Sequence, residues 1–340
     1  MPVPRGRRHR RARSPSHDCR RGAVSPLGTA GDGSPAGGDA PAGVRREVAL
    51  ARFTTVRTGG AAELFARPSS AEELVALLRW AERRQLGVGV IGSGSNLLVA
   101  DEGVTGLVLK LGGALAGIEP DGPRLRCGGG ARLPQIAARA AQLGLSGIEF
   151  GVSIPGTVGG AVRMNANAYG GELAKVLEWV EVATAAGTGR RDPAQLGFAY
   201  RRSSLESRAV VTRVGFLLRI DEPERVKATL ADLRAQRKQA QPSGIRTFGS
   251  TFKNPENPRA EGRSAGQLLD AAGCGGLRVG GARFSPKHAN FVDNDGTATT
   301  ADVVALMALG RARVAERFGV ALEPEVQRLG PVRLPWEQRC

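Results

Sequence analysis

Histidine, cysteine and aromatic residues are scarce in this sequence, and each scarcity narrows the kinds of site it can form. Three histidines occur among 340 residues, and two of them, His9 and His17, lie in an arginine-rich N-terminal stretch. His288 alone is therefore available to a folded domain, so we expect no metal site, and a serine hydrolase triad would depend on that residue. The four cysteines are scattered without a Cys-x-x-Cys pair, which argues against zinc or a disulfide framework: Cys19, Cys127, Cys274 and Cys340.

Aromatic residues account for 4% of the chain, whereas its formal net charge is +16. A stacking platform for bases needs aromatic side chains, and no recognised nucleic-acid motif is present. Residues 1–46 contain ten arginines and three aspartates, a net +7, and the other +9 is spread over many segments. This distribution suits an enzyme that attracts anionic ligands, and no specific nucleic-acid partner is expected. A basic nucleic-acid-binding protein remains the alternative from another class.

No stretch is apolar and long enough to span a bilayer, and the N-terminus lacks the apolar segment of a secretory signal. We therefore expect a cytoplasmic protein without membrane insertion. Residues 1–46 are rich in Gly, Pro, Ser, Ala and Arg, a composition that predicts a disordered tail because it buries little apolar surface. An organelle transit peptide and an over-extended start both remain compatible with it. No motif encodes the oligomeric state, and a monomer is the expectation.

Helix and strand patterns alternate from about Val48, which predicts an α+β fold with mixed strand pairing. Ser70 and Glu73 have capping-box spacing and open an amphipathic helix that runs to about Gln85. Glu222-Pro223 marks a boundary, after which a smaller C-terminal domain is expected. The other expected helices lie near 133–143, 224–239, 264–273 and from residue 300 onward, and the expected strands lie within 86–99 and at 106–111, 123–129, 177–184 and 209–220.

Two glycine-rich segments could hold a cofactor, because successive backbone N–H groups can approach a phosphate where no Cβ intervenes. The first comprises Gly92, Ser93, Gly94, Ser95 and Asn96. It runs into an apolar strand and not a helix, so it is not the dinucleotide fingerprint, and a tight hairpin explains it equally well. The second, residues 151–171, is too rich in Gly, Pro and Asn for regular structure to be expected. A diphosphate-containing cofactor between the two is the sharper hypothesis.

The stretch GSTFKNP at 249–255 is rich in turn-forming residues and taken alone indicates a surface turn. The other motifs in the sequence change that interpretation. Six motifs occur in a fixed order: GSGSNLLV (92–99), IPGTVGGAVRMNANAYGG (154–171), YRRSSL (200–205), GSTFKNP (249–255), PKHANF (286–291) and LEPEV (322–326). Together they resemble the UDP-N-acetylenolpyruvoylglucosamine reductase family, also called UDP-N-acetylmuramate dehydrogenase, from about residue 53 to 330.

The resemblance implies a two-lobed FAD-binding region of the vanillyl-alcohol-oxidase (PCMH) type followed by a smaller α+β substrate-binding domain. Its boundaries would be 47–221, with lobes 47–110 and 111–221, then 222–330 and a C-terminal tail at 331–340. It also implies FAD and NADPH as cofactors and reduction of UDP-N-acetylglucosamine enolpyruvate to UDP-N-acetylmuramate for peptidoglycan. No insertion between 200–205 and 249–255 could carry the extra tyrosine loop of the longer class, so the shorter class is expected.

Three residues match catalytic positions of the family. Arg201 would hold the substrate carboxylate with its planar, permanently charged fork. Glu325 would act in its protonated form, with its pKa raised by burial and by the substrate charge. Glu323, two residues away, is a nearby glutamate that could be mistaken for it. Ser250 would donate the proton to the carbon beside the carboxylate. For each, an ordinary surface or turn residue is the alternative that the surrounding motif outweighs.

Further residues are expected to bind ligands by the same resemblance. Cofactor contacts are expected from both glycine segments: Gly92, Ser93, Gly94, Ser95, Asn96, Ile154, Pro155, Gly156, Thr157, Gly159, Gly160 and Asn165. Substrate contacts are expected from Tyr200, Lys253, Asn254 and His288.

Two positions depart from the family pattern, and one other flavoenzyme class stays open. Asn167 stands where glycine is usual, and asparagine tolerates a positive φ, so we expect the turn to survive. The first loop reads Gly-Ser-Gly-Ser where Gly-Gly-Gly-Ser is commoner. An FAD-dependent oxidase of the same superfamily, acting on an alcohol or sugar, is the nearest alternative, although such oxidases often attach flavin through a histidine that neither loop contains.

Overall fold

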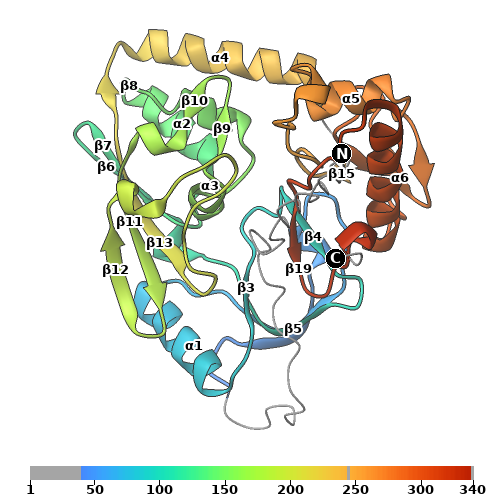
Figure 1. Ribbon diagram of the computed structural model, residues 1–340. Coiled ribbons are helices and arrows are strands. Elements are labelled where there is room, and N and C mark those ends of the chain that lie inside the picture. The colour runs from blue at the N-terminus through green and yellow to red at the C-terminus, as the bar shows by residue number, and fades with distance from the viewer. Residues whose placement is uncertain (1–39, 243–245, 338–340) are drawn as a thin grey trace, which may run out of the picture.

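The computed structural model describes residues 40–242 and 246–337, which form two N-terminal lobes and a C-terminal domain (Figure 1). Helices and strands alternate as expected, and both parallel and antiparallel pairs occur. The disorder expected for residues 1–46 concerns residues that lie mostly outside the described part of the chain. Arg45 and Arg46, the last two of them, belong to the first strand. Within the described ranges, no helix is long and apolar enough to cross a membrane.

The first lobe is built on a four-stranded sheet of order β1-β2-β5-β3, with β1–β2 antiparallel and the other pairs parallel. Ser70 accepts a hydrogen bond from Glu73 N and thereby caps the helix that covers the sheet, as the sequence predicts. The leucine side chains of this helix are buried along one of its faces. The elements are β1 (Arg45–Ala49), β2 (Ala61–Ala66), β3 (Val88–Val90), β5 (Val104–Leu109) and α1 (Ala71–Arg83).

The second lobe contains a fully antiparallel sheet of order β12-β11-β13-β7-β6. Alternate residues of its strands, such as Leu125, Cys127, Val214 and Phe216, are buried in one core with the helices on that face. The strands are β6 (Ile118–Asp121), β7 (Arg124–Gly128), β11 (Leu177–Thr184), β12 (Gly187–Arg191) and β13 (Val210–Leu217). The covering elements are α2 (Leu133–Gln142), α3 (Val158–Met164), and the short pair β8 (Leu145–Ser146) with β14 (Arg219–Ile220).

The expectation of irregular structure throughout 151–171 is wrong. Val158, Ala161 and Val162 recur at helical spacing and are buried in the second-lobe core, so tertiary packing stabilises α3 despite its two glycines. β9 (Asn167–Ala168) and β10 (Gly171–Glu172) then form a hairpin. The positive φ angles fall at Asn165 (40°), Tyr169 (49°) and Gly170 (78°), whereas Asn167 lies in β9. The departure at position 167 therefore needs no special backbone conformation.

Helix α4 (Pro223–Ala240) spans from the second lobe to the C-terminal domain along one side of the molecule (Figure 1). Its apolar residues Val226 and Leu230 pack against Ala137, Ala141 and Val152 of the second lobe. At its other end Lys287 Nζ donates a hydrogen bond to Lys238 O at 2.6 Å. The helix therefore connects two bodies that otherwise have separate cores.

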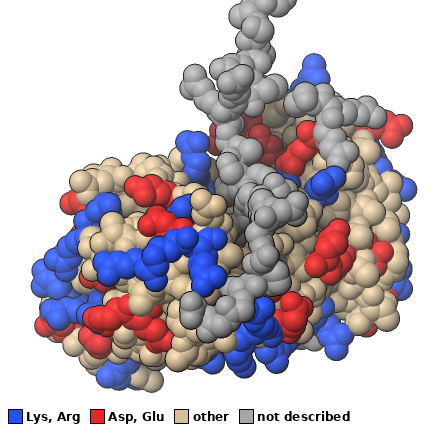
Figure 2. All heavy atoms as spheres, turned by 90° about the horizontal axis from the view of Figure 1, so that it is seen from below, with Lys and Arg blue, Asp and Glu red and all other residues tan. Residues whose placement is uncertain are grey.

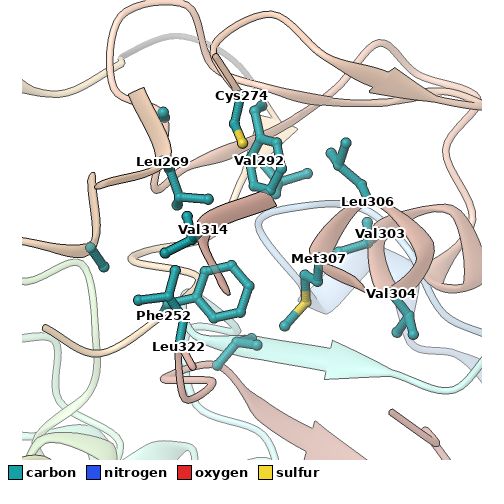
Figure 3. Packing of buried hydrophobic residues seen from close by; sticks show 14 of the residues in the cluster. Phe252, Leu269, Cys274, Val292, Val303, Val304, Leu306, Met307, Val314 and Leu322 are labelled. Atoms are coloured by element: carbon teal, nitrogen blue, oxygen red, sulfur yellow. The ribbon is translucent and has the colours of Figure 1, made fainter. Parts of the chain in front are cut away.

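The C-terminal domain packs two helices on a small antiparallel sheet of order β15-β18-β17-β16. Figure 3 shows Phe252 lying among Val314, Leu269 and Leu322 in its core. Thr299 and Asp302 form a capping box, and Gly319, with a φ of 65°, ends the long helix. The elements are α5 (Ala265–Ala271), α6 (Thr300–Phe318), β15 (Arg246–Thr247), β16 (Arg278–Val279), β17 (Ala282–Phe284) and β18 (Val292–Asn294).

The end of the C-terminal domain returns to the first lobe. β19 (Gln327–Leu329) pairs in parallel with β4 (Leu97–Val99), the strand that follows the first glycine loop. Asp101 accepts hydrogen bonds from Thr300 N and Ala301 N at 2.8 Å each, so the first lobe also caps α6. Leu334 is buried in the core of the C-terminal domain. The packed chain therefore continues past the boundary expected at residue 330.

Charged residues are distributed over the surface, as their spread along the sequence suggests. Figure 2 shows a band of Lys and Arg across the half of the molecule that carries α1 and β12, with acidic residues on both sides of it. On the outer face of the five-stranded sheet, two arginines are already paired with carboxylates, Arg124 with Glu178 and Arg126 with Asp121. This mixture of charges is typical of a solvated surface.

Candidate active site

The two glycine-rich loops lie against each other. The first loop joins β3 to β4, and the second leads into α3. A Cβ atom added at Gly92 would overlap Thr157 Oγ1 of the second loop. Gly94 has a φ of 64°, and a Cβ atom there would overlap the backbone carbonyl of Phe53. Glycine therefore suits both positions, because a side chain at Gly92 would push against the second loop and one at Gly94 would push against the backbone at Phe53.

Several buried polar atoms in and beside these loops lack a partner. Ser93 Oγ, Asn96 Oδ1 and Asn165 Oδ1 form no hydrogen bond within the described part of the chain. Buried polar groups are nearly always satisfied, and an unsatisfied one in a loop indicates a ligand or a bound water. All three belong to the residues that the sequence assigns to the cofactor.

A cavity of about 130 Å³ opens between the loops and the start of β13. Gly92, Thr157, Gly159 and Gly160 contribute to its wall. Gly160 is exposed, and a Cβ atom there would meet Thr157 Oγ1 at 3.6 Å, an ordinary contact, so the backbone there is not tightly packed. Exposed N–H groups and small polar side chains suit the diphosphate of a dinucleotide. The residues present therefore fit FAD. Ile154 and Pro155 are half-buried beside this wall, where Ile154 packs on the second-lobe core.

Lys110 also lines this cavity, and no sequence motif identifies it. Its Nζ donates a hydrogen bond to Gly92 O. Burial, with Arg67 and Arg132 nearby, lowers the pKa of the Lys110 ammonium. A cation placed against a glycine loop can neutralise an anionic ligand group, and a lysine at the end of a strand gives no spacing signal from which this position could be predicted.

The first loop is bonded to both segments that carry the expected proton donors. Ser95 O accepts a hydrogen bond from Gly249 N at 2.8 Å. Asn96 Nδ2 donates to Glu325 O at 3.2 Å, and Gln327 N donates to Asn96 O at 3.0 Å. Asn96, expected to contact the cofactor, thus holds the main chain of Glu325 and leaves its own Oδ1 for a further partner.

Arg201 and Glu325 form an ion pair, although they come from different bodies of the protein. Arg201 Nε lies 2.6 Å from Glu325 Oε1, and their side chains are 20% and 11% exposed. Burial raises the pKa of Glu325, while the cations Arg201 and Lys253 oppose that shift. Arg201 has a φ of 56°, an uncommon conformation for a non-glycine residue and one that is often found at functional sites. The pair joins the second lobe to the C-terminal domain.

Ser250 lies half-buried between two anchored peptide groups. Gly249 is bonded to the first loop, and Thr251 N donates to Asn290 O at 2.8 Å. Thr251 O accepts from Glu325 N at 2.9 Å. Both Thr251 and Phe252 are fully buried, so the segment is not the surface turn that its composition alone suggests. The structure places Ser250 and Glu325 on adjacent segments that are hydrogen-bonded to each other.

The residues expected to bind substrate divide into two groups. Tyr200 and Asn254 meet across the two bodies, since Asn254 N donates to Tyr200 Oη at 3.4 Å. Lys253 forms an ion pair with Glu323 at 3.2 Å. His288 instead packs edge-on against Phe291 and beside Gly266 of α5. Burial lowers the pKa of His288, and its Nδ1 accepts from Asn290 N at 3.3 Å, so its contacts in this structure are those of a packed residue.

Comparison with known proteins gives matches over most of the chain. Residues 62–191 match a family model described as FAD binding domain, and residues 241–329 match the UDP-N-acetylenolpyruvoylglucosamine reductase C-terminal domain. A UDP-N-acetylenolpyruvoylglucosamine reductase from an Anaeromyxobacter species is 48% identical over 84% of this chain and 89% of the relative. Reductase 2 of Symbiobacterium thermophilum is 43% identical over 87% and 94%. The crystal structure of the Thermus caldophilus reductase matches with a TM-score of 0.73 and 38% identity, over 84% of this chain and 98% of that one.

The fold, the FAD-binding match and the paired glycine loops define an FAD-dependent oxidoreductase with a cofactor region of the vanillyl-alcohol-oxidase type. Within that class, the chain belongs to the UDP-N-acetylenolpyruvoylglucosamine reductase family. The resemblance drawn from the six motifs is thus confirmed, as are the fold class and the FAD and NADPH cofactors. The same findings support the reductase over the FAD oxidase.

Proposed function

We propose that this chain reduces the enolpyruvyl ether of UDP-N-acetylglucosamine with electrons from NADPH, and that Arg201, Glu325 and Ser250 carry the proton chemistry. The observation that supports this assignment is the convergence of the Arg201–Glu325 ion pair and the Ser250 segment on the first glycine loop. An acid, a cation and a hydroxyl gathered beside a cofactor site suit an addition that develops negative charge on a carboxylate.

The two glycine loops would hold FAD, which would supply the hydride chemistry that links NADPH to the terminal vinyl carbon of the substrate. Arg201 binds the substrate carboxylate, where charge accumulates, through its planar guanidinium. A carboxylate at Arg201 takes a cation away from Glu325 and adds a negative charge beside it. Both changes raise the pKa of Glu325 further, which keeps its carboxyl protonated and able to donate a hydrogen bond.

Ser250 donates the proton to the carbon next to the carboxylate. A hydroxyl is a weak acid in water, but burial against a developing enolate makes the transfer reasonable, with Lys253 three residues away. Tyr200 lies beside the Arg201 guanidinium and its hydroxyl accepts a hydrogen bond from Asn254 N, so both can contact a sugar nucleotide bound at Arg201. Lys253 can exchange Glu323 for a phosphate. We place the reaction in the cytoplasm, where NADPH and nucleotide sugars occur, and propose a monomer as the active unit.

The experiment that tests the function is NADPH consumption with and without UDP-N-acetylglucosamine enolpyruvate under anaerobic conditions. UDP-N-acetylglucosamine, which lacks the vinyl group, is the matched control. We expect stoichiometric oxidation with the enolpyruvyl compound and none beyond a single turnover with the control. Aerobic peroxide production from an alcohol or sugar, without response to the enolpyruvyl compound, would instead establish the oxidase.

A further inference from the structure

Asn290 is a buried asparagine in the motif at 286–291, and the proposed function gives it no role. It is 3% exposed and lies on the loop between β17 and β18. Its Oδ1 accepts a hydrogen bond from Phe252 N at 2.9 Å, and its Nδ2 donates to Phe252 O at 2.8 Å. Its backbone carbonyl accepts from Thr251 N at 2.8 Å. One residue therefore makes three hydrogen bonds to the segment that carries Ser250.

The opposite side of the same segment is bonded to the chain of Glu325. Thr251 O accepts from Glu325 N at 2.9 Å, and Lys253 N donates to Glu323 O at 2.9 Å. Phe252 faces Pro324 in this pairing. Residues 251–253 are thus held between Asn290 on one side and residues 323–325 on the other, with Ser250 at the end of the clamped strip.

The chemistry of the carboxamide explains why asparagine suits this position. Phe252 is fully buried, so its N–H and C=O have no access to bulk water and need partners from the protein. An amide side chain supplies one donor and one acceptor in the arrangement of a neighbouring strand. A carboxylate would present an acceptor to Phe252 O, and an aliphatic side chain would leave both buried groups unsatisfied.

We propose that Asn290 is a positioning residue that fixes Ser250 in register with Glu325, and so sets the rate of proton donation without touching the substrate. This inference rests on the proposed function. Rates of proton transfer depend steeply on the placement of the donor, and a displacement of about 1 Å can cost roughly a hundredfold. A residue with only a packing role would instead affect stability and both half-reactions alike.

The test compares two variants with a matched control in the same domain. Asn290→Asp keeps the size and one acceptor but loses the donor to Phe252 O. Asn290→Gln keeps donor and acceptor but lengthens the side chain by one methylene, and it serves if the first variant folds poorly. Asn294→Asp is the control, because Asn294 is also buried and its side chain bonds Val56 O, at 2.7 Å, and the N–H groups of Gly296 and Ala298 instead of the Ser250 segment.

Anaerobic stopped-flow absorbance measures flavin reduction by NADPH and reoxidation by the enolpyruvyl compound separately. We expect Asn290→Asp to reduce within about threefold of the parent and to reoxidise roughly a hundredfold more slowly, with an increased solvent deuterium effect on reoxidation. Asn290→Gln should show the same split at about tenfold. Asn294→Asp should change melting temperature without any split.

Three results would overturn the inference: equal slowing of both half-reactions in either Asn290 variant, parent rates in both variants, or the same split in Asn294→Asp. Failure of the proposed function has a different signature. In that case the unmodified holoenzyme itself would not be reoxidised by the enolpyruvyl compound, whatever residue 290 is.

Discussion

Replacing Ser250 with alanine should slow one half of the reaction and leave the other nearly intact. The hydrogen bonds on each side of this residue are made by the backbones of Gly249 and Thr251, so an alanine keeps them, and we expect the melting temperature to change by only a few degrees. Reduction of the bound flavin by NADPH needs no proton from this hydroxyl. On the proposed mechanism, reoxidation by the enolpyruvyl compound does need that proton, and loss of a positioned general acid costs on the order of a hundred- to ten-thousandfold.

The assay is the anaerobic stopped-flow measurement of both half-reactions, together with substrate affinity by titration. One hydroxyl contributes about 1 kcal/mol of net hydrogen bonding, so the affinity should fall by no more than roughly fivefold. Ser250→Cys should restore part of the rate, since a thiol is the stronger acid. If flavin reduction slows as much as reoxidation, or if neither changes, Ser250 is not the proton donor.

Three further predictions follow from the same geometry. Burial raises the pKa of Glu325, and in the proposed mechanism the protonated form is the active one, so the rate of reoxidation should fall as pH rises through that pKa. Glu325→Gln should remove this limb of the pH–rate profile, and a rate that increases with pH would contradict the assignment. Lys110→Met should weaken FAD binding by roughly tenfold or more, measured as flavin retained after gel filtration; full retention would show that its contact with Gly92 O is only structural. Asp101→Ala removes two hydrogen bonds at the N-terminus of α6 and should lower the free energy of unfolding by about 1–2 kcal/mol in denaturant titrations, with flavin spectra unchanged; an unaltered midpoint would mean that water replaces the carboxylate.

The parts of the fold that could be predicted from the sequence are those stabilised locally. α1 and α6 carry their own caps and apolar periodicity, and both appear where these signals place them. α3 could not be predicted, because two glycines lower its intrinsic propensity and its stability comes from burial against β13. The pairing of β4 with β19 joins strands more than two hundred residues apart, and no local pattern encodes it.

The candidate site shows the same division. Arg201, Glu325 and Ser250 stand in motifs whose order identifies them. Lys110 and Asn290 have roles that depend on which segments are neighbours in space, and their residue types are common in unrelated contexts. A residue in a motif also need not belong to the site. His288 shares its motif with Asn290 and is expected from it to contact substrate, but it packs against α5.

The distribution of the three expected catalytic residues between two bodies has a mechanistic consequence. Ser250 and Glu325 lie on hydrogen-bonded chains of the C-terminal domain, so their separation is set within one core. Arg201 belongs to the second lobe, and its ion pair with Glu325 crosses to that domain. A substrate carboxylate could replace Glu325 as the anion paired with Arg201. The substrate would then contact both the second lobe and the C-terminal domain, and so keep the two joined. The two proposed proton donors are therefore positioned within one core, whereas the cation is brought beside them from the second lobe. On the proposed mechanism, the charge that Arg201 stabilises is formed where Glu325 and Ser250 can act on it.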